Sequence, residues 1–194
     1  MADTRAAPNK RQEIIDQAYR RFYDGGFHAT GIDTVMADTG ISKRTLYKYF
    51  PSKEDLIEAV LDQYGCDTES QLFAPAMARS DDPRRQIEAV FDVRRDLMAQ
   101  KDYQGCLAMK AGQEYIGKHE GIVARGKSAS LYVEDKFIDL CRRAGLTRPE
   151  DTGRQINLLF QGTALTAQMQ RDLTVFDLAK KALHILFAAA AAEN

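Results

Sequence analysis

A short segment of the chain concentrates positive charge that could bind an anionic polymer. Between Ser42 and Lys53 the sequence carries lysine and arginine but no aspartate or glutamate, although acidic residues are plentiful on both sides. The basic residues are Lys43, Arg44, Lys48 and Lys53. Their side chains can donate hydrogen bonds to phosphate oxygens and to the edges of bases in DNA. The whole chain has a formal net charge of −1, so the local distribution of charge, and not its sum, suggests a nucleic-acid partner.

Helical spacing separates these basic side chains from the apolar side chains of the same segment. In a helix over residues 43–49, one face consists of Leu46, Tyr49 and Phe50. The opposite face carries Lys43, Arg44, Tyr47 and Lys48. We expect the apolar face to dock and the basic face to stay free, with the Tyr47 hydroxyl able to bond a phosphate. An ordinary solvated amphipathic helix would show the same pattern.

Lys53 lies where a further helix is predicted to begin. Pro51 and Ser52 interrupt the chain, and Ser52-Lys53-Glu54-Asp55 has the pattern of a helix start. The first N–H groups of a helix have no partner within it. A phosphate at this point would therefore meet both an ammonium group and free backbone donors.

Two more helices are predicted ahead of the basic helix. The first has apolar residues at helical spacing and ends at Gly25-Gly26. The second begins at residues 30–33, where a Thr30 hydroxyl and an Asp33 carboxylate form a variant of the capping box, and ends near Thr39. Gly40 suits a tight turn, and Ser42 can cap the basic helix. Two short helices joined by a glycine turn indicate a helix-turn-helix motif.

The same residues resemble a known DNA-binding signature. Residues 26–30, Gly-Phe-His-Ala-Thr, and residues 40–56, Gly-Ile-Ser-Lys-Arg-Thr-Leu-Tyr-Lys-Tyr-Phe-Pro-Ser-Lys-Glu-Asp-Leu, are similar to that of the tetracycline-repressor (TetR) family, and the resemblance covers about residues 10 to 64. It implies phosphate contacts from Thr30, Tyr47 and Lys53. It implies base contacts from Lys43, Arg44 and Thr45, with Lys48 and Tyr49 at the wall of the major groove. Two positions depart from the family's pattern: Gly31 lacks a hydroxyl that is common there, and Asp33 is acidic where basic or polar residues are common.

The rest of the chain is also predicted to be helical, which gives an all-α fold. Apolar residues recur at helical spacing and no convincing period-2 strand is present. We predict a DNA-binding domain over residues 1–64 and a larger helical ligand-binding and dimerisation domain over residues 65–194. The last two helices carry apolar stripes that consist of Ile156, Leu159, Phe160, Thr163 and Ala167, and of Val175, Leu178, Ala182 and Leu186. These stripes either complete the core of one chain or form a dimer interface, and the resemblance favours a four-helix interface in a homodimer.

A ligand pocket is predicted from apolar and aromatic residues that have polar neighbours. The candidate lining residues are Phe91, Met98, Tyr103, Cys106, Met109, Gln113, Glu114, Phe160 and Gln161. Residues 105–114 resemble a segment of one branch of the family, which favours this helix as lining. The resemblance implies a regulator, a repressor on our interpretation, that a small-molecule ligand releases from a near-palindromic operator. The ligand itself is not determined by these residues.

Other classes of function find little support in the sequence. The three cysteines are widely spaced and the three histidines are scattered, so we expect no metal site and no catalytic site. Neither a phosphate-binding loop nor a dinucleotide fingerprint is present, so we expect no cofactor. The longest apolar run is far shorter than the roughly 20 residues of a membrane span, and we expect a cytoplasmic protein. The alternative function is a helical ligand-binding or interaction protein that does not bind DNA.

Overall fold

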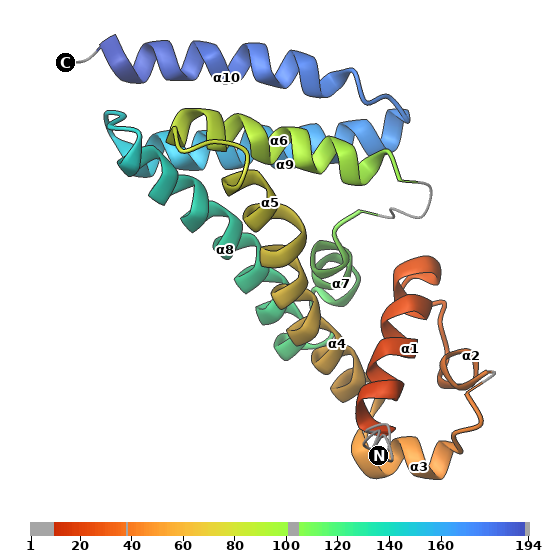
Figure 1. The fold of residues 1–194 in the computed structure, drawn as a ribbon. Helices are drawn as coiled ribbons and strands as arrows, with labels where there is room; N and C mark the ends of the chain where they lie inside the picture. The colour runs from red at the N-terminus through yellow and green to blue at the C-terminus, as the bar shows by residue number, and fades with distance from the viewer. Residues whose placement is uncertain (1–9, 38, 101–104, 193–194) are drawn as a thin grey trace, which may run out of the picture. The chain divides into compact units, whose positions relative to one another are not determined.

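The computed structural model describes residues 10–37, 39–100 and 105–192, and every regular element in these ranges is a helix (Figure 1). The all-α prediction is therefore confirmed. The helices are α1 Lys10–Gly25, α2 Ile32–Met36, α3 Lys43–Tyr49, α4 Lys53–Thr68, the π-helix η1 Glu69–Phe73, α5 Ala74–Met77, α6 Pro83–Met98, α7 Leu107–Tyr115, α8 Glu120–Arg143, α9 Pro149–Gln170 and α10 Val175–Ala192. None of these helices is long and apolar enough to cross a bilayer.

The chain packs as two compact units, which differ in one segment from the two predicted domains. The first unit consists of Met1–Tyr64 and Leu107–Lys127, and the second consists of Gly65–Cys106 and Ser128–Asn194. The division at Tyr64 falls inside the continuous helix α4 and not in a linker. Segment 107–127 packs with the N-terminal residues, whereas the prediction had placed it in the domain of residues 65–194. Packing units and functional domains need not coincide, so the functional boundary stays a prediction.

The first unit has a core built from the apolar stripes of its short helices. The fully buried side chains include Phe22 and Phe27, whose rings stack with centroids 5.2 Å apart. Helix α3 docks through Leu46 and Phe50, which are both buried. The predicted docking of Tyr49 is wrong, because 39% of its surface is exposed. Tyr49 follows Leu46 by three residues but lies far enough around the helix to leave the core.

Local capping explains where the helices of the first unit begin. Gly40 has a φ of +65° in the turn between α2 and α3, a conformation that residues with a Cβ rarely adopt. The Ser42 hydroxyl accepts a hydrogen bond from the Thr45 N–H (3.2 Å), which caps α3 as predicted. At the start of α4, Ser52 N–H donates to the Asp55 carboxylate (2.9 Å) and Asp55 N–H donates to the Ser52 hydroxyl (3.0 Å). These two bonds form a capping box, and the predicted helix start is confirmed.

The predicted cap of α2 is wrong. The N-cap residue is Gly31, and no side chain caps the helix. The Thr30 hydroxyl instead donates to the Arg21 carbonyl oxygen (3.3 Å), because Thr30 is buried against α1. Helix α2 also ends at Met36, earlier than the predicted end near Thr39.

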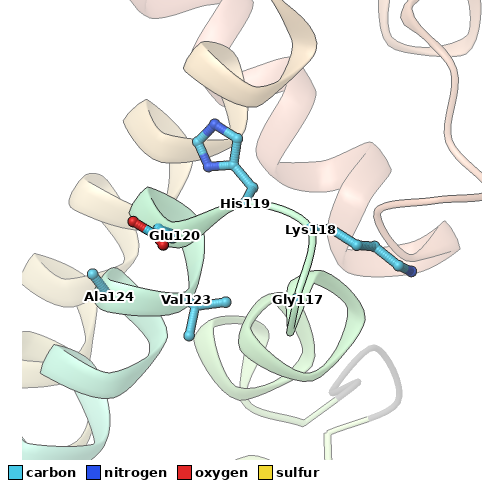
Figure 2. Close-up of a pocket in the computed structure, with 6 residues that line it drawn as sticks. All are labelled: Gly117, Lys118, His119, Glu120, Val123 and Ala124. Carbon is cyan, nitrogen blue, oxygen red and sulfur yellow. The ribbon is translucent and has the colours of Figure 1, made fainter.

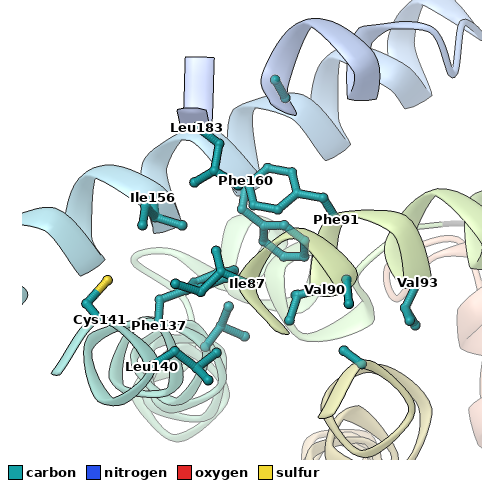
Figure 3. Close-up of a cluster of buried hydrophobic side chains, with 14 of the residues drawn as sticks. Ile87, Val90, Phe91, Val93, Phe137, Leu140, Cys141, Ile156, Phe160 and Leu183 are labelled. Carbon is teal, nitrogen blue, oxygen red and sulfur yellow. The ribbon is translucent and has the colours of Figure 1, made fainter. Parts of the chain in front are cut away.

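The second unit has a core of interlocking aromatic rings from α6, α8 and α9 (Figure 3). Phe160 packs edge-on against Phe91 and Phe137, with ring centroids 5.2 and 5.4 Å away. Burial in this core raises the pKa of the Cys141 thiol to about 12, so this cysteine stays protonated and serves as a packing group. Of the predicted stripe on α9, the residues Ile156, Phe160, Thr163 and Ala167 are buried. Most of that stripe therefore completes the core of a single chain.

Helices α7 and α8 approach each other closely within the first unit, at Gly112 and Gly126. A Cβ atom added to Gly126 would lie 2.9 Å from the Ala108 carbonyl oxygen and 3.1 Å from the Cα of Gly112. A Cβ atom added to Gly112 would meet its nearest neighbour, the Cα of Gly126, at an ordinary 3.7 Å. The two glycines therefore differ in how much space surrounds them, although they face the same crossing.

Gly126→Ala is expected to lower the free energy of unfolding by about 1–3 kcal/mol, because backbone atoms must move to admit the methyl group. Gly112→Ala is the matched control and is expected to be neutral or to stabilise the chain by up to about 1 kcal/mol through helix propensity. Denaturant unfolding at one fixed protein concentration measures both variants. Equal stability of the two variants would contradict the close approach of α7 and α8.

Candidate nucleic-acid interface

Helix α3 presents a continuous polar face to solvent. Lys43, Arg44, Tyr47, Lys48 and Tyr49 are all exposed, with 45% of the Tyr47 surface accessible. Five predicted contact residues are therefore available to a partner along one short helix, and Ser42 caps its first turn. Three cations and two phenol groups on one exposed surface suit a polyanion that also offers hydrogen-bond acceptors.

Thr45 is tied more closely to the protein than the other predicted base-contacting residues. It is half-buried, and its hydroxyl lies 2.9 Å from the Ser42 hydroxyl. Its backbone N–H donates to the same Ser42 hydroxyl. The side chain therefore helps to set the first turn of α3, and a contact with a base stays a prediction.

An ion pair joins the two helices of the helix-turn-helix. The Lys43 ammonium lies 2.6 Å from the Asp33 carboxylate, and both side chains are more than half exposed. The hydrogen bond and the charge of Asp33 raise the pKa of Lys43 above its ordinary value. The predicted capping role of Asp33 is thus replaced by contact with a residue that was predicted to read bases.

Two residues predicted to hold phosphates also bond to the chain itself. The Lys53 ammonium donates to the Phe27 carbonyl oxygen (2.6 Å). Thr30 is only 3% exposed, and its hydroxyl is committed to the Arg21 carbonyl oxygen. A phosphate contact from the Thr30 hydroxyl would require this bond to break. Lys53 is half-buried, so its remaining donors are still able to reach an anion.

The turn between α1 and α2 is held by the carboxylate of Glu114 in α7. This residue had been predicted to line a ligand pocket. Glu114 accepts hydrogen bonds from the backbone N–H of Phe27 (3.2 Å) and of His28 (2.8 Å). The His28 ring stacks on Tyr115, with centroids 4.9 Å apart. Burial, with the charges of Glu54 and Glu114, raises the pKa of Tyr115 to about 12. We call this arrangement of Glu114, Tyr115 and the turn the α7 clamp. The sequence indicated these two residues only as possible neighbours of a ligand pocket, and no signal in it pointed to a contact with the turn.

The predicted ligand-lining residues do not all fall in one unit. Met109, Gln113 and Glu114 belong to the first unit, and Phe91, Met98, Cys106, Phe160 and Gln161 belong to the second. Tyr103 lies outside the described residues. In the second unit Phe91 and Phe160 are in contact, and Gln161 donates to the Asn157 side-chain oxygen (3.4 Å). In the first unit Gln113 is exposed. The lining therefore stays a prediction.

A hollow of about 510 Å³ lies at the turn between α7 and α8 (Figure 2). Its lining consists of Gly117, Lys118, His119, Glu120, Val123 and Ala124. Figure 2 shows Lys118 and His119 pointing away from each other, so these two side chains do not converge on one ligand. Within the described residues, no cluster of three or more histidine, cysteine, aspartate or glutamate side chains could hold a metal ion.

Comparison with known proteins agrees with this reading of the first unit. Residues 14–60 match the family model described as bacterial regulatory proteins, tetR family. The chain is 28% identical over 134 residues to the transcriptional activator FasR of Mycolicibacterium smegmatis, a match that covers 69% of this chain and 59% of FasR. It is 42% identical over 60 residues to the transcriptional regulator RutR of Escherichia coli, which covers 31% of this chain and 28% of RutR. The chain thus matches less than two thirds of the length of these two relatives.

The fold extends the likeness to nearly the whole chain. A TetR-family transcriptional regulator from Streptomyces coelicolor superimposes with a TM-score of 0.83 over 93% of this chain and 95% of that one, at 24% identity. The reduced form of NemR from Escherichia coli superimposes with a TM-score of 0.80 over 90% and 95% of the two chains, at 18% identity. At these identities the likeness establishes the shared fold.

Removal of the Glu114 carboxylate is expected to loosen the turn between α1 and α2. Glu114→Ala leaves two backbone N–H groups without their charged acceptor, and bonds to charged groups are worth about 1.5–3 kcal/mol each. Amide hydrogen exchange at Phe27 and His28 should therefore be at least about tenfold faster than in the unmodified chain. Gln113→Ala, a change of the exposed neighbouring residue, is the control. Unchanged exchange at both amides in Glu114→Ala would show that the α7 clamp does not hold the turn.

Proposed function

Because the chain belongs to the TetR family of bacterial regulatory proteins, we propose that it is a sequence-specific DNA-binding transcriptional regulator, and a repressor that a small molecule releases from a near-palindromic operator. The observation that carries the proposal is the exposed basic face of α3, which a glycine turn and a capped helix start hold in a helix-turn-helix. The relatives named above are transcriptional regulators, and the proposal assigns no catalytic activity to this chain.

The proposed contacts divide into two classes. Lys43 and Arg44 are the first two residues of α3. In a recognition helix, these N-terminal residues meet base edges in the major groove. Arginine or lysine that donates to guanine O6 and N7 discriminates between bases by about 1–3 kcal/mol. Tyr47, Lys48 and Lys53 are proposed to contact the backbone or the groove wall, which adds affinity without sequence preference. A protein that acts on chromosomal DNA in this way would work in the bacterial cytoplasm.

Lys43→Ala combined with Arg44→Ala is expected to abolish sequence preference. We would select duplexes from a random pool at near-physiological salt, with the unmodified chain, this double variant and Lys48→Ala in parallel. The unmodified chain should enrich a near-palindrome, the double variant should enrich none, and Lys48→Ala should keep the same sequence at lower affinity. Arg85→Ala, a change of an exposed arginine in α6, is the control. No enrichment by the unmodified chain, with or without candidate effectors, would favour the alternative of a helical protein that does not bind DNA.

A homodimer is proposed because one recognition helix makes few contacts and a two-fold pair doubles them. The support is an apolar surface on α9 and α10 that the chain leaves uncovered. Its exposed members are Leu158, Leu165, Met169, Leu178 and Ile185, each at least 59% accessible. A groove of about 430 Å³ lies along this surface, between the two helices at Gly162 and Ala182. Apolar patches of this kind on a folded chain are typical of interfaces.

Leu178→Asp is expected to weaken dimerisation by at least about tenfold, because each copy would place a charge in an apolar contact. Sedimentation velocity across a range of concentrations measures the dimer. Ile116→Asp is the matched control, since Ile116 is 67% exposed, close to the 62% of Leu178, but lies just after α7 and away from α9 and α10 in the sequence. The same self-association in both variants would exclude this surface as the interface.

Release by a ligand is proposed to act through the α7 clamp. Helix α7 carries three of the predicted ligand-lining residues and also holds the turn at which α2 begins. A ligand that binds more tightly when α7 is in one position than in another would therefore favour that position. The population would shift towards the placement of the helix-turn-helix that goes with it. Thermodynamic linkage then requires operator DNA and ligand to weaken each other's binding by the same factor.

A further inference from the structure

Asp33 stands out within the proposed DNA-binding surface because it is the wrong charge for that surface. It lies in the first turn of α2, its side chain is 80% exposed, and its carboxylate contacts the first residue of α3 at 2.6 Å. A carboxylate beside a DNA phosphate is repelled at short range, with a Coulomb energy of about 1 kcal/mol at 4 Å in water. If repulsion were its only effect, Asp33 would lower the affinity for DNA with nothing to compensate for that loss.

The compensating effect follows from what the ion pair does to Lys43. An ammonium group has three donors, and Asp33 occupies one of them, so two remain for a partner. The pair also neutralises the charge that would draw Lys43 to any phosphate. Lys43 can keep its ion pair with Asp33 while it donates to a base edge inside the groove. When Lys43 contacts a phosphate instead, the Asp33 carboxylate is brought beside a second anion.

The two kinds of DNA complex are therefore affected unequally. In a non-specific complex, basic side chains rest on phosphates, so either the ion pair breaks or the carboxylate is carried against the backbone. In a specific complex, Lys43 points to base edges and the pair stays intact. An element that disfavours the wrong complex increases specificity even when it adds nothing to the right one.

We propose that Asp33 is a specificity-determining residue that acts through Lys43: it positions the Lys43 ammonium for base contact and weakens binding to DNA of unrelated sequence. The inference rests on the proposed DNA-binding function.

Asp33→Asn tests the proposal by removing the charge while keeping the size of the side chain. Affinity for random-sequence duplex should rise about fivefold for each recognition helix, which corresponds to the Coulomb energy above. The slope of log affinity against log salt concentration for that duplex should steepen by about 0.9 for each recognition helix, because Lys43 would then release a counterion. Operator affinity should change less than twofold, so the ratio of specific to non-specific binding should fall about fivefold for each recognition helix.

Two further variants separate this mechanism from simpler ones. Asp24→Asn, a change of an exposed aspartate in α1, alters the net charge equally without touching Lys43, and it should leave the specificity ratio unchanged. In a Lys43→Met background, Asp33→Asn should lose its effect on that ratio. Asp33→Glu should retain most of the specificity, because it keeps the charge.

The outcomes are distinct. Equal effects of Asp33→Asn and Asp24→Asn would overturn the proposal in favour of net charge. An undiminished effect of Asp33→Asn in the Lys43→Met background would overturn it in favour of direct repulsion of phosphates. If the unmodified chain binds neither operator nor random duplex at any salt concentration, the proposed function itself fails, and this inference fails with it. Circular dichroism of each variant checks that the helices are intact.

Discussion

One residue, Phe27, connects the parts of the first packing unit. The Phe27 N–H donates to a carboxylate from α7, and the Phe27 carbonyl oxygen accepts from the ammonium at the start of α4. The same residue places its ring in the core against Phe22. Because backbone groups that lose their partners away from water are costly, this turn has few alternative positions. The turn sets where α2 begins, and α2 sets where α3 can lie.

This constraint changes how the charges near the helix-turn-helix should be understood. Lysine and threonine side chains that look like phosphate ligands in the sequence also hold the fold, since Lys53 binds the turn and Thr30 binds α1. The chemistry left for a partner is concentrated on α3. Even there, Asp33 restrains the first cation. In the proposed function, DNA binding on this surface is thus a competition between phosphates or bases and the protein's own acceptors.

The second unit uses its apolar residues in two ways. Phe160 and its neighbours on α9 fill a close-packed aromatic core, in which a large cavity would be costly. A different face of α9, together with α10, carries leucine, methionine and isoleucine at four- and seven-residue spacing and stays exposed. A helix that is apolar on two faces has two surfaces to cover, and one chain covers only the first of them.

The sequence by itself determined the helical class, the helix-turn-helix and the basic face of α3. These depend on local rules: the apolar spacing of Ile14, Ala18 and Phe22, the positive φ of Gly40, and the caps at Ser42 and Ser52 all act within a few residues. Only the tertiary structure decided which polar groups were already bonded. Glu114 lies 86 residues from His28, and Asp33 meets Lys43 across a turn. No periodicity encodes such pairs, because they arise when separate helices dock, and docking also decided which apolar face of α9 became core.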